Sequence, residues 1–291
     1  MDEIINAFGD CNSGLIGSAV DPCSITSYGD LKGIILLRPG TKITAENFAL
    51  STYWQTLIQE KKAFPYLNLF NFEQTTPENE TATSSTGNLR TIRDGKPQYT
   101  LTFDGNPCLV KSLRNKKGLV WDIILVFDKA TVFLVNDDGT ISGFQASYFD
   151  VGTMTLQSGT DIQGVTAMIQ LDSAEDFNAN QGFVLSNVIN LNRIKGAFEA
   201  DLTVTAEAGT TVLVKAVSAC NNSVNYVGLE APTNWKVNGV APTAVTYNAT
   251  TGLYTLTVTA LTAGNPVVVV LAGTDDLNNV YVGRGETITS A

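Results

Sequence analysis

The 291-residue chain contains no histidine. Catalysis by Ser-His-Asp or Cys-His groups, histidine metal sites and histidine pH switches are therefore excluded within this chain. The sequence also lacks a G-x-S-x-G nucleophile elbow, a phosphate-binding P-loop and a dinucleotide-binding glycine fingerprint. These absences argue against an enzyme, and we expect no catalytic residues, no cofactor and no bound metal.

Basic residues are scarce: 18 Lys and Arg stand against 28 Asp and Glu, which gives a formal net charge of -10. Holding nucleic acid through its phosphates needs a basic surface. No apolar run reaches the roughly 18 residues that span a bilayer, and the acidic first ten residues do not resemble a secretory signal. We therefore expect no membrane partner and synthesis in a cytoplasm.

Four cysteines are too few and too scattered for a disulfide framework. Cys11 and Cys23 are compatible with a loop-closing bridge or with half of a metal site. Without histidine, however, a four-cysteine zinc site is a weak interpretation. We expect the thiols to be reduced, as is usual in a protein that is made in a cytoplasm.

Two acidic clusters allow a functional and a structural interpretation. The segment 137–139 (Asp-Asp-Gly) resembles part of a calcium loop, but a hairpin turn explains the same residues. Asp172, Glu175 and Asp176 suggest a carboxylate pair for glycoside hydrolysis, but Ser173 also predicts the start of a short helix. Carboxylates so near in sequence point in different directions, so the helix start is favoured and a hydrolase is the weakest functional hypothesis.

The first 195 residues predict a β-rich domain with a single convincing helix. Thr44 occupies an N-cap position, and Ile43 and Phe48 have the spacing of a hydrophobic staple. Leu50, Trp54, Leu57 and Ile58 then follow the spacing of one buried helix face. We expect the helix at about 45–62, ending before Pro65, and strands around it in a sandwich or barrel-like arrangement.

The composition changes near residue 196. Residues 197–291 are dominated by Thr, Val, Ala and Gly and contain three basic side chains. About seven short strands separated by turns predict an immunoglobulin-like sandwich at 196–291 with Trp235 in its core. Cys220 is the one cysteine in this segment, so we expect the fold without the internal disulfide of antibody domains.

A long polar segment at about 73–97 connects two strand candidates. A connection of this length without its own core is either a mobile surface loop or a functional arm. We favour an arm that orders against a neighbouring subunit, because Thr-rich segments can extend a partner's sheet. The candidate inter-subunit residues are Thr76, Glu78, Glu80, Thr83, Arg90 and Arg93.

Charge is segregated along the first domain. Residues 90–117 hold seven basic against two acidic side chains, and residues 122–176 hold nine acidic against one basic side chain. Complementary faces of this kind set the register of identical subunits, unless the charges interleave in the fold. The candidate basic face consists of Lys96, Lys111, Arg114, Lys116 and Lys117. The candidate acidic face or lumen consists of Asp137, Asp138, Asp161, Asp172, Glu175 and Asp176.

The helix at 45–62, the arm at 73–97, the strand pair 99–103 and 120–127, and the appended sandwich together resemble the tail-tube and related ring-forming virion proteins of tailed bacteriophages. The resemblance implies homo-oligomeric rings or a tube, arms that bridge stacked subunits, and an acidic lumen past which DNA moves as cargo. It also implies other tail or portal-vertex proteins as partners, and a place in the tail or head-tail region of the virion after synthesis in the host bacterial cytoplasm.

Two alternatives remain open. One is a capsid accessory or decoration protein. The other is a β-sandwich adhesin that binds surface glycans through solvent-facing aromatic residues, for which Tyr226, Trp235 and Tyr247 are the candidates.

Overall fold

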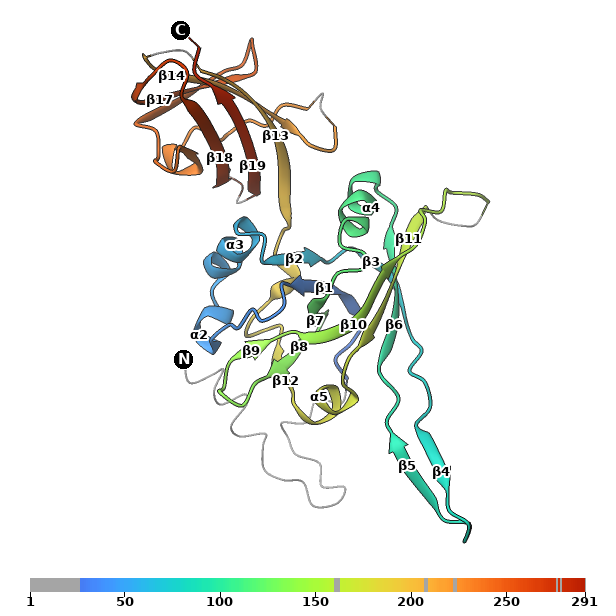
Figure 1. The fold of residues 1–291 in the computed structure, drawn as a ribbon. Helices are drawn as coiled ribbons and strands as arrows, with labels where there is room; N and C mark the ends of the chain where they lie inside the picture. The colour runs from blue at the N-terminus through green and yellow to red at the C-terminus, as the bar shows by residue number, and fades with distance from the viewer. Residues whose placement is uncertain are drawn as a thin grey trace. The chain divides into compact units, whose positions relative to one another are not determined.

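The computed structural model describes residues 27–159, 163–206, 209–221, 224–275, 277 and 279–290 (Figure 1). The fold is mainly β, as the sequence predicts. The described chain divides into two compact units, one with residues 27–54 and 62–194 and the other with residues 55–61 and 195–290.

The first unit is built around one ten-stranded sheet that curls into a half-barrel. The strand order is β12-β8-β7-β10-β11-β6-β3, with β1 on the other side of β7, β2 beside β1, and β9 beside β8. All of these pairs are antiparallel. The strands are β1 (Leu31–Leu37), β2 (Ala63–Tyr66), β3 (Leu69–Gln74), β6 (Gln98–Asp104), β7 (Trp121–Phe127), β8 (Ala130–Val135), β9 (Ile141–Ser142), β10 (Phe144–Val151), β11 (Gly164–Leu171) and β12 (Gln181–Leu185).

Strand β7 lies at the centre of this unit. It pairs with β1 on one edge and with β8 and β10 on the other. Its residues from Trp121 to Val126 are all buried, as a nearly continuous apolar run predicts for a strand covered on both faces. The main core gathers on the inner face of the sheet, where Leu101, Phe103 and Ile123 are fully buried.

The predicted helix at 45–62 is interrupted. The structure has α2 (Ala45–Phe48) and α3 (Ser51–Gln59), and Thr44 caps α2 as expected by accepting a hydrogen bond from the N–H of Asn47. The indole N–H of Trp54 donates to the carbonyl of Phe48 at 2.9 Å, so this carbonyl bonds a side chain beside the break. Leu50 lies in the break and is half exposed, so its placement on the buried face was wrong.

The described part of the first unit also contains the helices α4 and α5 and a short 3-10 helix. Helix α4 (Pro107–Arg114) was not predicted, although Asn106 caps it and Pro107 opens it. Helix α5 (Ala174–Ala179) begins where Ser173 predicts it, with the Ser173 hydroxyl accepting the N–H of Asp176. The 3-10 helix η1 spans Leu191–Arg193.

The second unit has an immunoglobulin-like topology, as predicted. Its seven strands follow the order β15-β18-β19-β13-β14-β17-β16. When β13 to β19 are lettered A to G in chain order, this order reads C-F-G followed by A-B-E-D, the two sheets of an immunoglobulin-like sandwich. The two sheets are joined because the first strand, β13, also pairs in parallel with the last strand, β19. The elements are β13 (Ala197–Ala206), β14 (Gly209–Ser218), η2 (Pro232–Asn234), β15 (Trp235–Val237), β16 (Ala244–Asn248), β17 (Leu253–Leu261), β18 (Pro266–Thr274) and β19 (Val280–Ile288).

Trp235 on the third strand is fully buried and is the centre of this core. Its indole N–H donates to the carbonyl of Leu229 at 2.7 Å, and its ring lies 5.1 Å from the ring of Tyr254. The buried tryptophan of the predicted sandwich is therefore confirmed.

Two of the cysteines correct the expectation of reduced thiols. Cys108 in α4 and Cys220 after β14 are each disulfide-bonded. A disulfide depends on the distance between Cα atoms, which the spacing of cysteines in the sequence does not reveal. Cys11 and Cys23 lie outside the described residues. Within the described part of the chain, no helix has the length and apolar character to cross a membrane.

Strand β17 provides a test of the second core. Leu256 is fully buried, whereas the neighbouring Thr255 points to the opposite face. We expect Leu256→Ala to lower the free energy of unfolding by about 2–5 kcal/mol, because it leaves a cavity. Thr255→Ala should change it by less than about 1 kcal/mol. Amide hydrogen exchange of β14 and β17 peptides in the full chain measures both, and equal losses would contradict the assigned facing of β17.

Candidate functional site

The segment between β3 and β6 forms a hairpin that continues beyond the body of the first unit (Figure 1). Strands β3 and β6 pair as far as Gln74 and Tyr99, and the N–H of Thr75 donates to the carbonyl of Gln98 at 2.9 Å. Beyond this point β4 (Glu80–Thr83) pairs with β5 (Leu89–Arg93) as a separate two-stranded sheet. We call residues 75–97 the arm.

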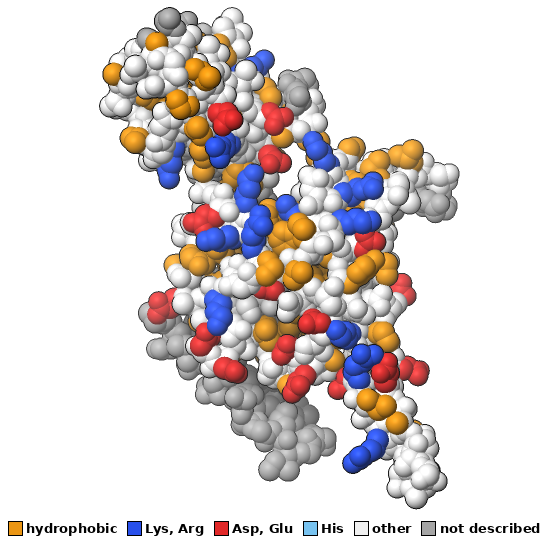
Figure 2. Space-filling view, viewed as in Figure 1, with side chains coloured by type: hydrophobic (Ala, Val, Ile, Leu, Met, Phe, Trp, Pro, Cys, Tyr) orange, Lys and Arg blue, Asp and Glu red, His pale blue; other side chains and the backbone are white. Residues whose placement is uncertain are grey.

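The arm is unusual because nothing in the described chain covers it as far as Asp94, and only Gly95, Lys96 and Pro97 are partly or fully buried where the arm joins β6. Every residue from Glu73 to Asp94 is exposed. Leu89 is 71% exposed and Ile92 is 67% exposed, and Figure 2 shows hydrophobic side chains on the arm surface. A two-stranded hairpin without a packing face is marginally stable in water, and covering one leucine contributes about 1.5–3 kcal/mol. The exposed apolar side chains of the arm are therefore available to pack against another surface.

The base of the arm is held by side-chain hydrogen bonds and by a close approach of two backbone segments. The side chain of Asn79 donates to the carboxylate of Asp94 at 2.8 Å and accepts the N–H of Gly95 at 2.9 Å. A Cβ atom at Gly95 would lie 1.8 Å from the carbonyl oxygen of Pro77, so the two backbones approach too closely for a larger residue. Charged side chains gather around this base, as Figure 2 shows.

The tip of the arm is a defined turn. The N–H of Ser84 donates to the carbonyl of Asn88 at 2.8 Å, and the N–H of Gly87 donates to the carbonyl of Ser84 at 2.9 Å. Gly87 has φ +84°, a left-handed conformation that glycine adopts without strain. With its base and tip both fixed, the arm presents a fixed pattern of side chains to solvent.

All six candidate inter-subunit residues lie in the arm. Thr76 and Glu78 precede β4, and the hydroxyl of Thr76 accepts a hydrogen bond from the side chain of Gln74. The remaining candidates, Glu80, Thr83, Arg90 and Arg93, lie in β4 and β5. The sequence analysis did not identify Asn79, Gly95 or Leu89. For Leu89 a signal was present, because Leu89 and Ile92 are two large apolar residues in an otherwise polar segment.

The candidate basic face centres on α4. Lys111 and Arg114 occupy its last turn, where cations favour the negative end of the helix dipole. The ammonium of Lys116 lies 3.9 Å from the centroid of the Phe64 ring, in a cation–π contact. These roles are structural and account for three of the five basic residues.

The other two basic residues form ion pairs with acids of the following segment. Lys96 pairs with Asp172 at 2.8 Å, and Lys117 pairs with Asp150 at 2.7 Å. Both pairs are partly exposed and contribute little to stability on their own. The charge segregation along the sequence is therefore partly neutralised within the folded chain.

The candidate acidic residues divide between two places. Asp172 lies just before α5, and Glu175 and Asp176 lie in its first turn, where acids favour the positive end of the dipole. Asp137 and Asp138 lie in the turn between β8 and β9. Asp161 is outside the described residues.

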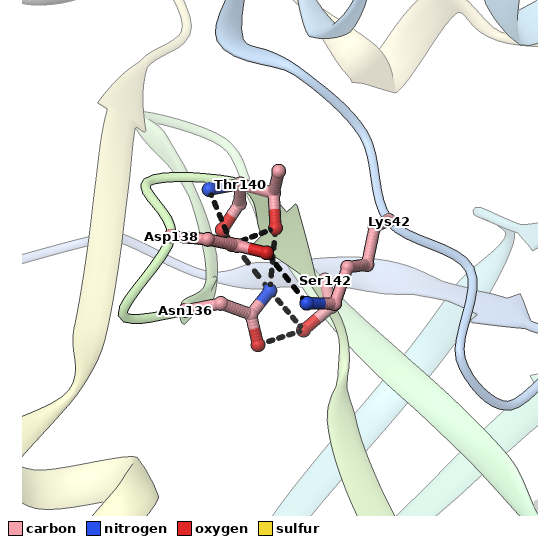
Figure 3. A network of polar contacts seen from close by, with 5 residues as sticks. All are labelled: Lys42, Asn136, Asp138, Thr140 and Ser142. Atoms are coloured by element: carbon pink, nitrogen blue, oxygen red, sulfur yellow. Dashed lines mark hydrogen bonds and ion pairs between the residues drawn. The ribbon is translucent and has the colours of Figure 1, made fainter.

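Asp138 is the centre of a polar network (Figure 3). Its carboxylate accepts hydrogen bonds from Lys42 at 2.6 Å and from the N–H and hydroxyl of Thr140. The side chain of Asn136 donates to Thr140 and Ser142 in the same turn. The hydrogen bond from Lys42 is the main reason that the pKa of Asp138 lies well below its usual range.

These contacts make the segment 137–139 a hairpin turn, which the sequence offered as the alternative to a calcium loop. Both carboxylate oxygens of Asp138 already accept hydrogen bonds. Across the described ranges, no three Asp, Glu or Cys side chains converge as metal ligands.

Comparison with known protein families finds no model that matches the chain, and comparison with curated proteins finds no match either.

The base of the arm yields a first test. Gly95→Ala should disrupt the close approach to Pro77 and loosen the arm, and Asn79→Ala should do so by removing two hydrogen bonds. We expect both variants to be cut by trypsin after Arg90 and Arg93 several times faster than the unchanged chain. Ser85→Ala, at the tip, is the control and should leave the rate unchanged. Unaltered cleavage of Gly95→Ala would show that the base does not hold the arm.

The Lys42–Asp138 pair yields a pH prediction. The folded-state pKa of Asp138 is depressed, so its contribution to stability is present above the unfolded pKa and is lost as pH falls through the folded pKa. Lys42→Met should raise the pKa of Asp138 toward its usual value, as followed by NMR titration of the carboxyl carbon. Lys32→Met removes a cation that pairs with Asp30 instead, and should leave Asp138 unchanged. A pKa unaffected by Lys42→Met would remove Lys42 as the cause.

Proposed function

We propose that this chain is a non-enzymatic structural protein that assembles with copies of itself through the arm. The observation that carries the proposal is the arm itself, a hairpin with a fixed base and tip whose residues from Glu73 to Asp94 are all exposed. A free chain gains nothing from such an element. A neighbouring subunit that covers Leu89 and Ile92 supplies the missing packing face.

The edges of the sheet in the first unit support self-assembly further. The main strand path ends in β12 and β3, each of which has a single pairing partner among the described strands. An unpaired edge strand offers backbone groups to another chain. One chain thus has both an arm without a cover and edges without a partner. A contact between two different surfaces of identical chains repeats from copy to copy and produces a ring or an open filament.

We propose further that the assembly is a ring or tube of a bacteriophage virion, with a place in the tail or head-tail region. The resemblance of the arm, the β-rich domain and the appended immunoglobulin-like unit to tail-tube proteins supports this proposal. The net charge of -10 supports DNA as passing cargo, because an acidic surface does not hold phosphates. Other tail or portal-vertex proteins are the expected partners.

The adhesin alternative loses one of its three aromatic candidates. Trp235 is fully buried in the core of the second unit and does not face solvent, while Tyr226 and Tyr247 are half-buried. The residue pattern along a strand does not show whether an aromatic side chain is exposed, because its exposure depends on the strands that pack over it. A glycan-binding role therefore has no specific support and is not proposed.

Arm removal tests self-assembly directly. Residues 76–95 are replaced by Asn-Gly, which with Lys96 and Pro97 leaves a four-residue connection between Thr75 and Gln98 and retains Lys96. We expect the unchanged chain to form rings or longer assemblies in mass photometry and negative-stain microscopy, and the deletion variant to stay monomeric. A double variant at the tip, Ser85→Ala with Thr86→Ala, retains the arm and should assemble. Circular dichroism checks that both variants fold, and normal assembly of a folded deletion variant would reject the proposal.

A further inference from the structure

The two faces of the arm differ in charge. Residues opposite each other in an antiparallel pair project their side chains on the same face. Thr81 lies opposite Thr91, and Thr83 lies opposite Leu89. These four residues form a face without a charged group, which we call the uncharged arm face.

The other side of the arm is charged. Ala82 lies opposite Arg90, and Glu80 lies opposite Arg93, with which it forms an ion pair at 2.7 Å. The register shifts between Glu80 and Thr81, which leaves Ile92 without a partner in a β-bulge. The uncharged arm face is therefore the side of the paired strands that loses no charge hydration when another surface covers it.

A second surface of the first unit is uncharged along β6 and β11. Glu73 of β3 lies opposite Thr100 and Asp150 of β10 lies opposite Met168, so a carboxylate borders this surface on each side. On β6 and β11, Tyr99, Leu101 and Phe103 point into the core, so the residues between them point outward. The outward pairs are Gln98 with Gln170, Thr100 with Met168, and Thr102 with Thr166. None of the six is charged, five are half-buried and Met168 is 37% exposed. We call these six residues the uncharged body face.

These two faces do not meet within one chain. The arm continues the β3–β6 hairpin past the end of β6 at which Gln98 lies, and α4 follows the opposite end (Figure 1). An arm that lies on a body face must therefore come from a second copy. The paired part of the arm fits within the length of the body face, because Glu80 to Thr83 spans about 10 Å and Gln98 to Thr102 spans about 13 Å.

We infer that the uncharged arm face of one copy packs on the uncharged body face of a second copy. The inference rests on the proposed self-assembly and identifies the two surfaces that make the contact. Leu89 and Met168 supply the apolar area, and the threonines pack as β-branched side chains do between sheets. Arg90, Arg93 and Glu80 project from the opposite face of the arm and stay in water, so the contact does not remove their hydration.

Two neighbouring residues of β4 give a matched test of the arm. Thr83→Glu places a carboxylate on the uncharged arm face, and Ala82→Glu places the same charge on the other face, opposite Arg90. Both positions are exposed, so both variants should fold. We expect Thr83→Glu to raise the concentration for half-assembly by about tenfold or more, since it buries an unpaired charge, and Ala82→Glu to change it by less than about twofold. Equal effects of the two variants would overturn the inference.

The body face is tested in the same way. Met168→Glu should weaken assembly by about tenfold or more. Leu213→Glu is the control, because Leu213 lies on a strand of the second unit and is 36% exposed, against 37% for Met168. Hydrogen exchange of β6 and β11 peptides verifies that Met168→Glu retains its sheet. Assembly of a folded Met168→Glu variant at the normal concentration would remove the body face from the contact.

Cross-linking between copies tests the pairing of the two faces. One copy carries Thr83→Cys and the other Met168→Cys, both with Cys11→Ser and Cys23→Ser, and a short bismaleimide is added to the assembled mixture. We expect a covalent dimer of one copy of each kind, and several times less product when Ala82→Cys replaces Thr83→Cys. If the arm deletion abolishes assembly but this cross-link fails to form, the proposed function stands and the inference falls. If the deletion variant assembles normally, both fall.

Discussion

The pairing of β3 with β6 is the interaction on which the rest of this structure depends. On one side of the pair it turns Tyr99, Leu101 and Phe103 into the core, and on the other it leaves Thr100 and Thr102 facing outward. It also directs the arm, because the same two strands continue past Gln74 and Gln98 into β4 and β5. One backbone ladder thus sets the position of the core, the composition of the outer face and the direction of the arm.

The sequence predicts those parts of the fold whose signal is local. Alternating Thr and Val residues with Trp235 are sufficient for the immunoglobulin-like unit, because each strand there has one buried and one solvated face. Ser173 is sufficient for the start of α5. Helix α4 was also within reach, since Asn106 followed by Pro107 is a start signal.

The remaining features depend on contacts that no local pattern contains. The predicted helix at 45–62 breaks after Phe48, whose carbonyl accepts a hydrogen bond from the indole of Trp54. The position of this break depends on where Trp54 is buried. Lys96 and Asp172 pair across 76 positions of sequence. The faces of the arm depend on a bulge at Ile92, because one extra residue changes which side chains share a face. The polar composition predicts an arm, but the side chains that share each face of the arm are set by the strand register, which the composition does not reveal.

Net charge and the proposed self-assembly impose opposite demands on this chain. Copies that each carry a charge of -10 repel one another beyond contact, and salt screens this repulsion over about 8 Å at physiological ionic strength. A contact between charged surfaces of such copies must match each acid with a base, whereas uncharged surfaces avoid that requirement. Lys96 and Lys117 already pair with acids of their own chain, which leaves less positive charge to attract a neighbour. In the proposed assembly, surfaces of Thr, Gln, Met and Leu on the arm and on β6–β11 would let identical acidic subunits approach closely, and the net charge would then disfavour contacts in any other register.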